Sequence, residues 1–174
     1  KEGEYLEGTG SMIMYRKNQF VYACLSPRTH RTLFDRFCDI LGLKGIAFDA
    51  VDEHGVPIYH TNVMMALGAE VAIICLDAIK ELKDRERVQK LLKSTGHEVV
   101  PITHAQMNAF AGNMLEVRNQ KGEPFLIMSK RAYDSLEKAQ IDSLSQFAEL
   151  LVIPLDVIET YGGGSVRCMM AEIF

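Results

Sequence analysis

The sequence predicts an α/β fold built from repeated units of two strands, a helix and a third strand. Four short segments share a pattern of small residues, then Ser or Asn, then apolar residues. They are residues 8–14 (GTGSMIM), 59–65 (YHTNVMM), 110–116 (FAGNMLE) and 162–168 (GGGSVRC). The Ser or Asn positions are 51, 51 and 52 residues apart, and the same order of predicted elements follows each of the first three. Such regular spacing is typical of a chain made of equal supersecondary units.

The first unit illustrates this order of elements. A strand at the Ser11 segment leads through a polar turn at 16–18 into an apolar strand at 20–25. A helix follows, because apolar residues recur at three-to-four-residue spacing until Gly42 ends the pattern. These apolar residues are Leu33, Phe34, Phe37, Ile40 and Leu41. A strand at 45–51 then closes the unit.

The later units repeat the order. The second has its turn, strand, helix and closing strand at 68–70, 71–76, 85–94 and 98–102. The third has them at 119–123, 125–128, 135–150 and 151–157. In the fourth, three consecutive glycines permit close backbone approach and precede Cys168, which we expect at the start of a short buried strand. The repeats therefore span about 5–55, 56–106, 107–160 and, in part, 161–174 of a single domain, 1–174.

Both ends of the chain fall inside the repeat pattern. Charged residues stand directly before the first strand, and the fourth unit has only begun when the sequence ends. Repeats that bury their faces against neighbours need a closed ring or capping ends. We therefore expect the C-terminal portion of a longer protein, with a complete small α/β domain as the alternative.

Composition argues against several classes of function. The formal charge of −4 disfavours a nucleic-acid surface, since phosphate binding normally requires a basic excess. No apolar run reaches the roughly 18 residues of a membrane span, and the first residues do not resemble a signal peptide. The four cysteines are scattered without metal-binding spacing. We therefore expect reduced thiols, a cytoplasmic location, no metal and no other cofactor; a homo-oligomer is left open.

Three chemically active side chains lie close to the repeated segments. Glu7 stands four residues before the first motif Ser, His60 two before the following motif Asn, and Cys168 three after the last motif Ser. In a closed ring, equivalent strands line one axis and would bring these side chains together. Thiol, imidazole and carboxylate are the parts of nucleophilic catalysis. Taken singly, each also fits an ordinary structural role: a buried Cys, a structural His and a solvated loop carboxylate.

The four motifs resemble those of the guanidino-group-modifying superfamily, the penteins, and within it the amidinotransferase-like group that includes bacterial citrulline utilisation hydrolases. The resemblance rests on residues 6–11 (LEGTGS), 59–65 (YHTNVMM), 110–113 (FAGN) and 162–169 (GGGSVRCM), and it covers essentially the whole chain. It implies a pseudo-fivefold α/β propeller of ββαβ units, of which this chain would hold three and part of another. It also implies an arginine deiminase-related enzyme that acts on a small amino-acid substrate.

The resemblance implies a role for each site residue. Cys168 aligns with the family nucleophile, His60 with the acid/base, and Glu7 with the carboxylate that partners the histidine or the substrate's terminal nitrogens. Arg28 falls where related deiminases pair an arginine with the substrate α-carboxylate, which suits a planar guanidinium. Backbone N–H groups around Gly164 are candidates for stabilising an oxyanion.

One position departs from the superfamily pattern. Deiminases and amidinotransferases have His-x-Asp, whereas this chain has Asn62 two residues after His60. A carboxylate favours a cationic guanidinium, while a neutral amide suits a neutral ureido group. We therefore expect a cysteine-dependent C–N hydrolase that converts citrulline to ornithine, ammonia and carbon dioxide. An Asn62 that only bonds backbone is the alternative.

Other activities stay open at this stage. Within enzymes, the alternatives are arginine deiminase and amidinotransferase, which differ from the first hypothesis in substrate. A non-catalytic pentein that only binds its ligand, like the ribosome anti-association factors, is a different class, and those proteins lack the cysteine motif. The chain could also be an inactive fragment of an active parent.

Overall fold

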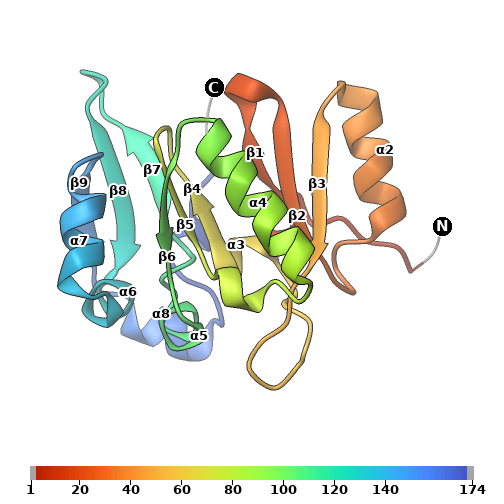
Figure 1. Cartoon of the computed structure of the whole chain (residues 1–174). Coiled ribbons are helices and arrows are strands. Elements are labelled where there is room, and N and C mark those ends of the chain that lie inside the picture. The colour runs from red at the N-terminus through yellow and green to blue at the C-terminus, as the bar shows by residue number, and fades with distance from the viewer. Residues whose placement is uncertain (1–2, 172–174) are drawn as a thin grey trace.

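The computed structural model describes residues 3–171 and contains three three-stranded sheets in that part of the chain. In every sheet the first two strands are antiparallel, and the third is parallel to the second. A helix lies in the connection between the two parallel strands, as a parallel crossover requires. Figure 1 shows the three units side by side in chain order. The predicted ββαβ order is therefore confirmed for three successive units.

The first unit consists of α1 (Gly8–Ser11), β1 (Ile13–Tyr15), η1 (Arg16–Asn18), β2 (Phe20–Leu25), α2 (Arg31–Leu41) and β3 (Lys44–Asp49). The motif segment around Ser11 is thus one helical turn followed by a strand, and not a strand throughout. Gly42 ends α2 as predicted, because it adopts the left-handed conformation, with φ of 64°, that glycine tolerates best.

The second unit consists of α3 (Thr61–Met64), β4 (Met65–Leu67), β5 (Val71–Ile74), η2 (Leu76–Ala78), α4 (Leu82–Ser94) and β6 (Glu98–Pro101). The third consists of α5 (His104–Asn108), β7 (Leu115–Arg118), β8 (Pro124–Ser129), α6 (Lys130–Ser135), α7 (Lys138–Leu144) and β9 (Glu149–Ile153). After it come α8 (Asp156–Tyr161) and η3 (Val166–Met169). The predicted fourth unit, 161–174, lies partly outside the described residues.

The helical region predicted at about 135–150 is confirmed only in part. α7 lies inside it, α6 ends at its first residue, and the chain is extended between the two helices at Leu136 and Glu137. The side chain of Gln140 accepts a hydrogen bond from the backbone N–H of Glu137 at 2.8 Å and donates one to the carbonyl of Pro101 at 2.7 Å. The local bond to Glu137 caps the start of α7, and the bond to Pro101 ties it to the preceding unit.

The buried strand predicted to begin at Cys168 is wrong for the described residues. The segment is the short 3₁₀ helix η3, in which the N–H of Cys168 donates to the carbonyl of Ser165 at 3.1 Å. Val166 is buried, whereas Met169 and Met170 are 49% and 37% exposed. The apolar run that favoured a strand therefore does not form a buried face here.

Side-chain to backbone bonds join the motif segments of successive units. Thr61 Oγ1 donates to the carbonyl of Ser11 at 2.6 Å. Asn113 Nδ2 donates to the carbonyl of Asn62 at 3.0 Å, and Asn113 Oδ1 accepts from the N–H of Arg167 at 3.1 Å. The first strands also neighbour one another, β1 beside β4 and β4 beside β7. The motifs are thus brought together as expected, although they are about fifty residues apart in sequence.

The main hydrophobic core runs through all three units, and its largest fully buried side chains include Tyr22, Met64, Ile73 and Met128. A smaller cluster around Val21 and Phe34 lies beneath α2. Because one core joins the sheets, the site formed by their motif segments rests on a rigid base.

His97 is a buried polar residue at the edge of this core. Its Nδ1 lies 2.8 Å from Thr95 Oγ1, and its ring packs edge-on against Tyr15 with centroids 4.5 Å apart. Burial lowers the pKa of His97 below its ordinary value of 6.5, because the charged ring would be poorly solvated. The folded protein therefore favours the neutral ring.

We predict that acid weakens the fold through His97. Between the lowered folded pKa and 6.5 the unfolded chain binds a proton that the folded protein excludes, so this contribution is complete above 6.5 and is lost as the pH falls. Urea unfolding at about pH 7.5 and about pH 5 measures the change. The change should be smaller in His97→Gln and unaltered in His54→Gln, a control on an exposed turn. Equal changes in wild type and His97→Gln would contradict the prediction.

Candidate active site

Glu7 and His60 stand directly before two equivalent helical turns. Glu7 precedes α1, where its N–H donates to Ser11 Oγ at 2.9 Å, and Ser11 Oγ donates to the carbonyl of Arg28 at 3.0 Å. His60 precedes α3, which is tied to α1 by the bond from Thr61 to Ser11. The repeated motif therefore fixes both residues relative to each other.

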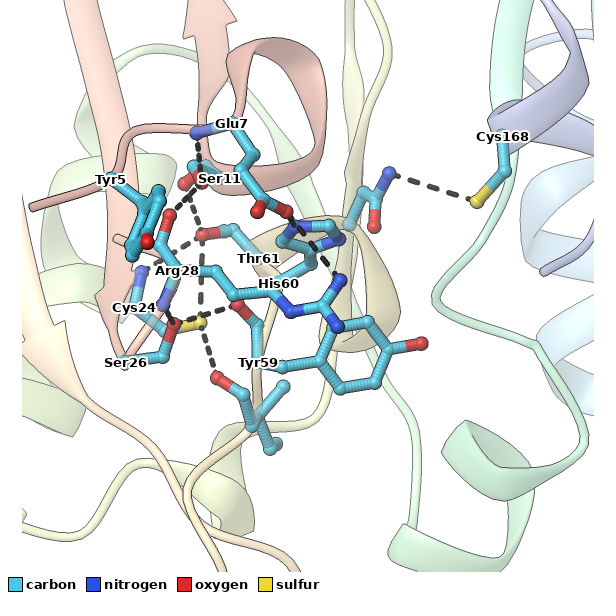
Figure 2. A network of polar contacts seen from close by, with 12 residues as sticks. Tyr5, Glu7, Ser11, Cys24, Ser26, Arg28, Tyr59, His60, Thr61 and Cys168 are labelled. Atoms are coloured by element: carbon cyan, nitrogen blue, oxygen red, sulfur yellow. Dashed lines mark hydrogen bonds and ion pairs between the residues drawn. The ribbon is translucent and has the colours of Figure 1, made fainter. Parts of the chain in front are cut away.

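The Glu7 and His60 side chains form a close pair. Glu7 Oε2 lies 2.6 Å from His60 Nε2, and the two side chains are 39% and 17% exposed. Gly10 makes room for the ring: a Cβ there would lie 2.8 Å from His60 Nδ1. The predicted imidazole and carboxylate are thus in contact (Figure 2).

Arg28 extends this pair toward solvent. One of its guanidinium nitrogens lies 3.6 Å from the same Glu7 Oε2, and the guanidinium sits over the Tyr59 ring at 5.5 Å from its centroid. Ser26 Oγ accepts from the N–H of Arg28 at 3.1 Å and donates to the carbonyl of Tyr59 at 2.7 Å, which holds the Arg28 loop against the Tyr59 segment. The predicted carboxylate-binding arginine therefore faces Glu7.

Cys168 lies among amide groups. Its Sγ is 3.3 Å from Asn113 Nδ2 and 3.9 Å from Asn62 Nδ2. Asn62 is only 4% exposed, and its Oδ1 makes no hydrogen bond within residues 3–171. The backbone of Gly164 packs closely, since a Cβ there would lie 3.2 Å from Cys168 Cβ. The alternative in which Asn62 only bonds backbone does not describe this arrangement, because its amide faces the thiol.

Cys168 and His60 are not in direct contact in the described structure, and Figure 2 shows the thiol set apart from the pair formed by Glu7 and His60. Asn62 connects Cys168 and His60. It belongs to α3, two residues after His60, and its Nδ2 lies 3.9 Å from the Cys168 sulfur. Tyr59 interacts electrostatically with Cys168 and with Arg28. Burial raises the pKa of Tyr59, the charge of Cys168 raises it further, and the charge of Arg28 lowers it.

A cavity of about 240 Å³ opens at Cys168. Its lining residues are Tyr59, Val63, Met107, Asn108, Phe110, Asn113, Gly163, Gly164 and Cys168. Among these described residues there is no Asp, Glu, Lys, Arg or His, so the wall around the thiol carries no fixed charge. Asn113 was not chosen as a site residue from sequence, although it occupies the same motif position as Asn62 and could have been found that way.

The other three cysteines are free and buried. Burial raises the pKa of Cys24 to about 11 and also raises the pKa values of Cys38 and Cys75. Cys168 is free and exposed. Because the thiolate is the nucleophile, the thiol at the cavity is the one suited to chemistry.

Within residues 3–171, no group of three or more His, Cys, Asp or Glu side chains is arranged to hold a metal ion. None of the helices described there is long and apolar enough to cross a membrane.

We predict that Gly10→Ala displaces the His60 ring. The added methyl group would overlap the imidazole, and overpacking of this kind typically costs about 1–3 kcal/mol of unfolding free energy. Urea unfolding and NMR signals of the His60 ring measure both effects. Thr9→Ala, at the exposed neighbouring position, is the control. An unchanged ring environment in Gly10→Ala would contradict the packing argument.

Solved structures share this fold at low sequence identity. ArgZ, an arginine dihydrolase from the ornithine-ammonia cycle in cyanobacteria, is 15% identical with a TM-score of 0.74, over 94% of this chain and 24% of its own. AgrE, solved with ornithine and NAD⁺, is 19% identical with a TM-score of 0.73, over 94% and 22%. SxtG, an amidinotransferase from Microseira wollei in the saxitoxin biosynthetic pathway, is 12% identical with a TM-score of 0.65, over 97% and 45%. This chain thus spans about a quarter of the length of ArgZ and AgrE.

No match was found among curated proteins. A family model described as N,N dimethylarginine dimethylhydrolase, eukaryotic, matches residues 1–174. The match covers all four motif segments, from the turn that holds Glu7 to the turn that holds Cys168. The chain therefore belongs to the N,N dimethylarginine dimethylhydrolase (eukaryotic) family, within the pentein or amidinotransferase-like superfamily.

Proposed function

We propose that the chain carries the site of a cysteine-dependent hydrolase that cleaves a C–N bond of a ureido or guanidino compound, with citrulline as the substrate and ornithine, ammonia and carbon dioxide as products. The observation that carries the choice of substrate is the uncharged wall around Cys168. A guanidinium cation in a cavity without a carboxylate would lose its hydration without an ion pair, whereas a ureido group loses only hydrogen bonds.

The amides at the thiol support the same choice. Asn62 presents a buried carbonyl oxygen without a partner in the described structure, which suits an N–H donor of the ureido group. The one carboxylate of the predicted site, Glu7, faces His60 and Arg28 instead of the thiol. Its negative charge is therefore balanced by neighbours and not offered to a cationic substrate.

The proposed reaction has two stages. The Cys168 thiolate attacks the ureido carbon and forms an S–C bond. A C–N bond then breaks, and the departing nitrogen takes a proton from His60. In the second stage His60 accepts a proton from water, whose oxygen attacks the enzyme-bound carbon and releases the thiol. The carbamate that leaves decomposes to carbon dioxide and an amine, which balances one water consumed per citrulline.

The remaining site residues assist these steps. Glu7 orients the His60 ring through their 2.6 Å contact. Arg28 binds the substrate α-carboxylate through its exposed guanidinium, and backbone N–H groups beside Gly164 stabilise the developing oxyanion. No cofactor takes part.

A second candidate is hydrolysis of N,N-dimethylarginine to citrulline and dimethylamine, and the family match over residues 1–174 favours it. The same thiol attack applies, with dimethylamine as the departing group. Arginine deiminase and amidinotransferase activities are further alternatives within the superfamily. The N-terminal domain of ArgZ, 16% identical to this chain, has been solved covalently bound to a reaction intermediate, which is in keeping with covalent chemistry on this fold.

We further propose that the three described units belong to a pseudo-fivefold propeller. The contacts between the first strands of successive units support this arrangement. The residues around 161–174 begin a fourth unit of the same domain. The protein acts in the cytoplasm on a small amino-acid substrate, without nucleic acid or membrane, and a homo-oligomer stays open.

Replacing the nucleophile tests the mechanism. In the complete protein that contains this chain, Cys168→Ala should lower release of ammonia or amine by at least about a thousandfold, as loss of a covalent nucleophile does. Citrulline, arginine and N,N-dimethylarginine are assayed side by side, and Cys38→Ala, on the buried face of α2, is the matched control. Appreciable turnover by Cys168→Ala would exclude the covalent mechanism. Faster turnover of arginine or N,N-dimethylarginine than of citrulline would exclude citrulline as the preferred substrate.

Changing the charge at the thiol tests the choice of substrate. Asn62→Asp places a carboxylate beside Cys168. The ratio of kcat/KM for arginine to kcat/KM for citrulline should rise by about tenfold, equivalent to about 1.4 kcal/mol. Asn108→Asp adds the same charge to the cavity wall without contacting the sulfur and serves as the control. An unchanged ratio in Asn62→Asp would show that residue 62 does not select between ureido and guanidinium.

A further inference from the structure

A buried carboxylate lies directly beneath the glycine turn that carries Cys168. Glu159, in α8, has a side chain that is 0% exposed. Its Oε1 accepts a hydrogen bond from Ser165 Oγ at 2.7 Å. Ser165 is itself fully buried, and its carbonyl accepts the N–H of Cys168 at 3.1 Å. A short path of two hydrogen bonds therefore runs from the Glu159 carboxylate to the backbone of the cysteine.

Arg131 balances this buried charge. Its Nε lies 3.2 Å from Glu159 Oε2 and forms an ion pair with it. Within the described residues this oxygen makes no hydrogen bond, so the ion pair is its polar contact. The guanidinium also donates to Thr160 Oγ1 at 3.1 Å and lies over the Phe110 ring at 5.8 Å from its centroid. Because Arg131 belongs to α6, the pair joins the third unit to the segment that follows it.

Phe110 connects this pair to the cavity wall. Phe110 lines the cavity and has a φ of 67°, a conformation that is uncommon for a residue other than glycine. Arg131 thus contacts the wall at Phe110 and the nucleophile turn through Glu159. One guanidinium therefore links the cavity wall to the turn before Cys168.

We propose that Glu159 and Arg131 are positioning residues that hold the Cys168 sulfur against the Asn62 and Asn113 amides. This inference rests on the proposed function of Cys168 as the nucleophile. Neither side chain touches the substrate cavity, so both act through Ser165 and Phe110. A buried ion pair is often no more stabilising than apolar residues of similar volume. What the pair supplies that apolar residues cannot is a directional acceptor for Ser165.

Alkylation of Cys168 by iodoacetamide tests the proposal without relying on turnover. The other three cysteines are buried, so the native protein is labelled at Cys168, and peptide mass spectrometry follows the rate. In Glu159→Leu the Ser165 hydroxyl loses its acceptor, so the sulfur should move away from the Asn62 and Asn113 amides, and alkylation should slow about tenfold, the scale of effect that a small misplacement produces. In the complete protein kcat should fall by a similar factor, with KM within about twofold of wild type.

Two further variants separate positioning from folding. Glu159→Leu combined with Arg131→Met removes both charges, so no buried charge is left unpaired and the protein should keep its Tm. The Ser165 acceptor is still lost, so slow alkylation should persist. Lys130→Gln removes an equal charge from α6 at an exposed ion pair with Asp134 and should alkylate like wild type. Arg131→Lys retains the positive charge, so its alkylation rate should lie between those of the double variant and the wild-type protein.

The outcomes distinguish this inference from the proposed function. Slow alkylation in Glu159→Leu and in the double variant, with normal Tm in the double variant, supports positioning even if no substrate is turned over. Unchanged or faster alkylation in the double variant overturns it, whatever the activity of the wild-type protein. A lower Tm with a wild-type alkylation rate in Glu159→Leu also overturns it, because the pair then serves stability alone.

Discussion

The bonds between successive motif segments are the constraint on which the rest of the structure depends. Two of them join a side chain of one unit to the backbone of the unit before it, from Thr61 to the carbonyl of Ser11 and from Asn113 to the carbonyl of Asn62. In the third, the Asn113 side chain accepts from the backbone N–H of Arg167 in the segment that follows. The segments must approach closely for this, and at Gly112 a Cβ would collide with the backbone of Val63. The glycines and short polar side chains of the motif are therefore a packing requirement as well as a sequence signature.

The fold could be predicted from the sequence as far as local patterns determine it. Strand and helix periodicities and the glycine after α2 are local signals, so the ββαβ order was readable in three units. The break between α6 and α7 was not, because Gln140 takes its partners partly from the preceding unit. The conformation at Cys168 could not be predicted either. The apolar residues near it favour a strand, but local backbone bonds to the carbonyls of Ser165 and Arg167 form a 3₁₀ turn.

The site shows the same division. Convergence of the motifs predicts that Glu7 and His60 meet, and they lie 2.6 Å apart. Sequence spacing places Asn113 at the same motif position as Asn62. It does not show that the Asn113 amide lies 3.3 Å from the sulfur while its oxygen accepts from the N–H of Arg167. Arg28 faces Glu7 from a loop whose conformation includes the bond from the Arg28 N–H to Ser26 Oγ. These details are tertiary, and no single stretch of sequence contains them.

Charge is arranged so that the thiol stands apart from it. The Glu7 carboxylate is shared by His60 and Arg28, and the Glu159 carboxylate is buried against Arg131. Each negative group near the site thus has a positive neighbour, while Cys168 faces amides and an uncharged wall. In a medium of low dielectric constant an unpaired charge acts strongly over several ångströms. Keeping both carboxylates paired therefore leaves the two neutral amides of Asn62 and Asn113 as the polar side-chain groups beside the sulfur.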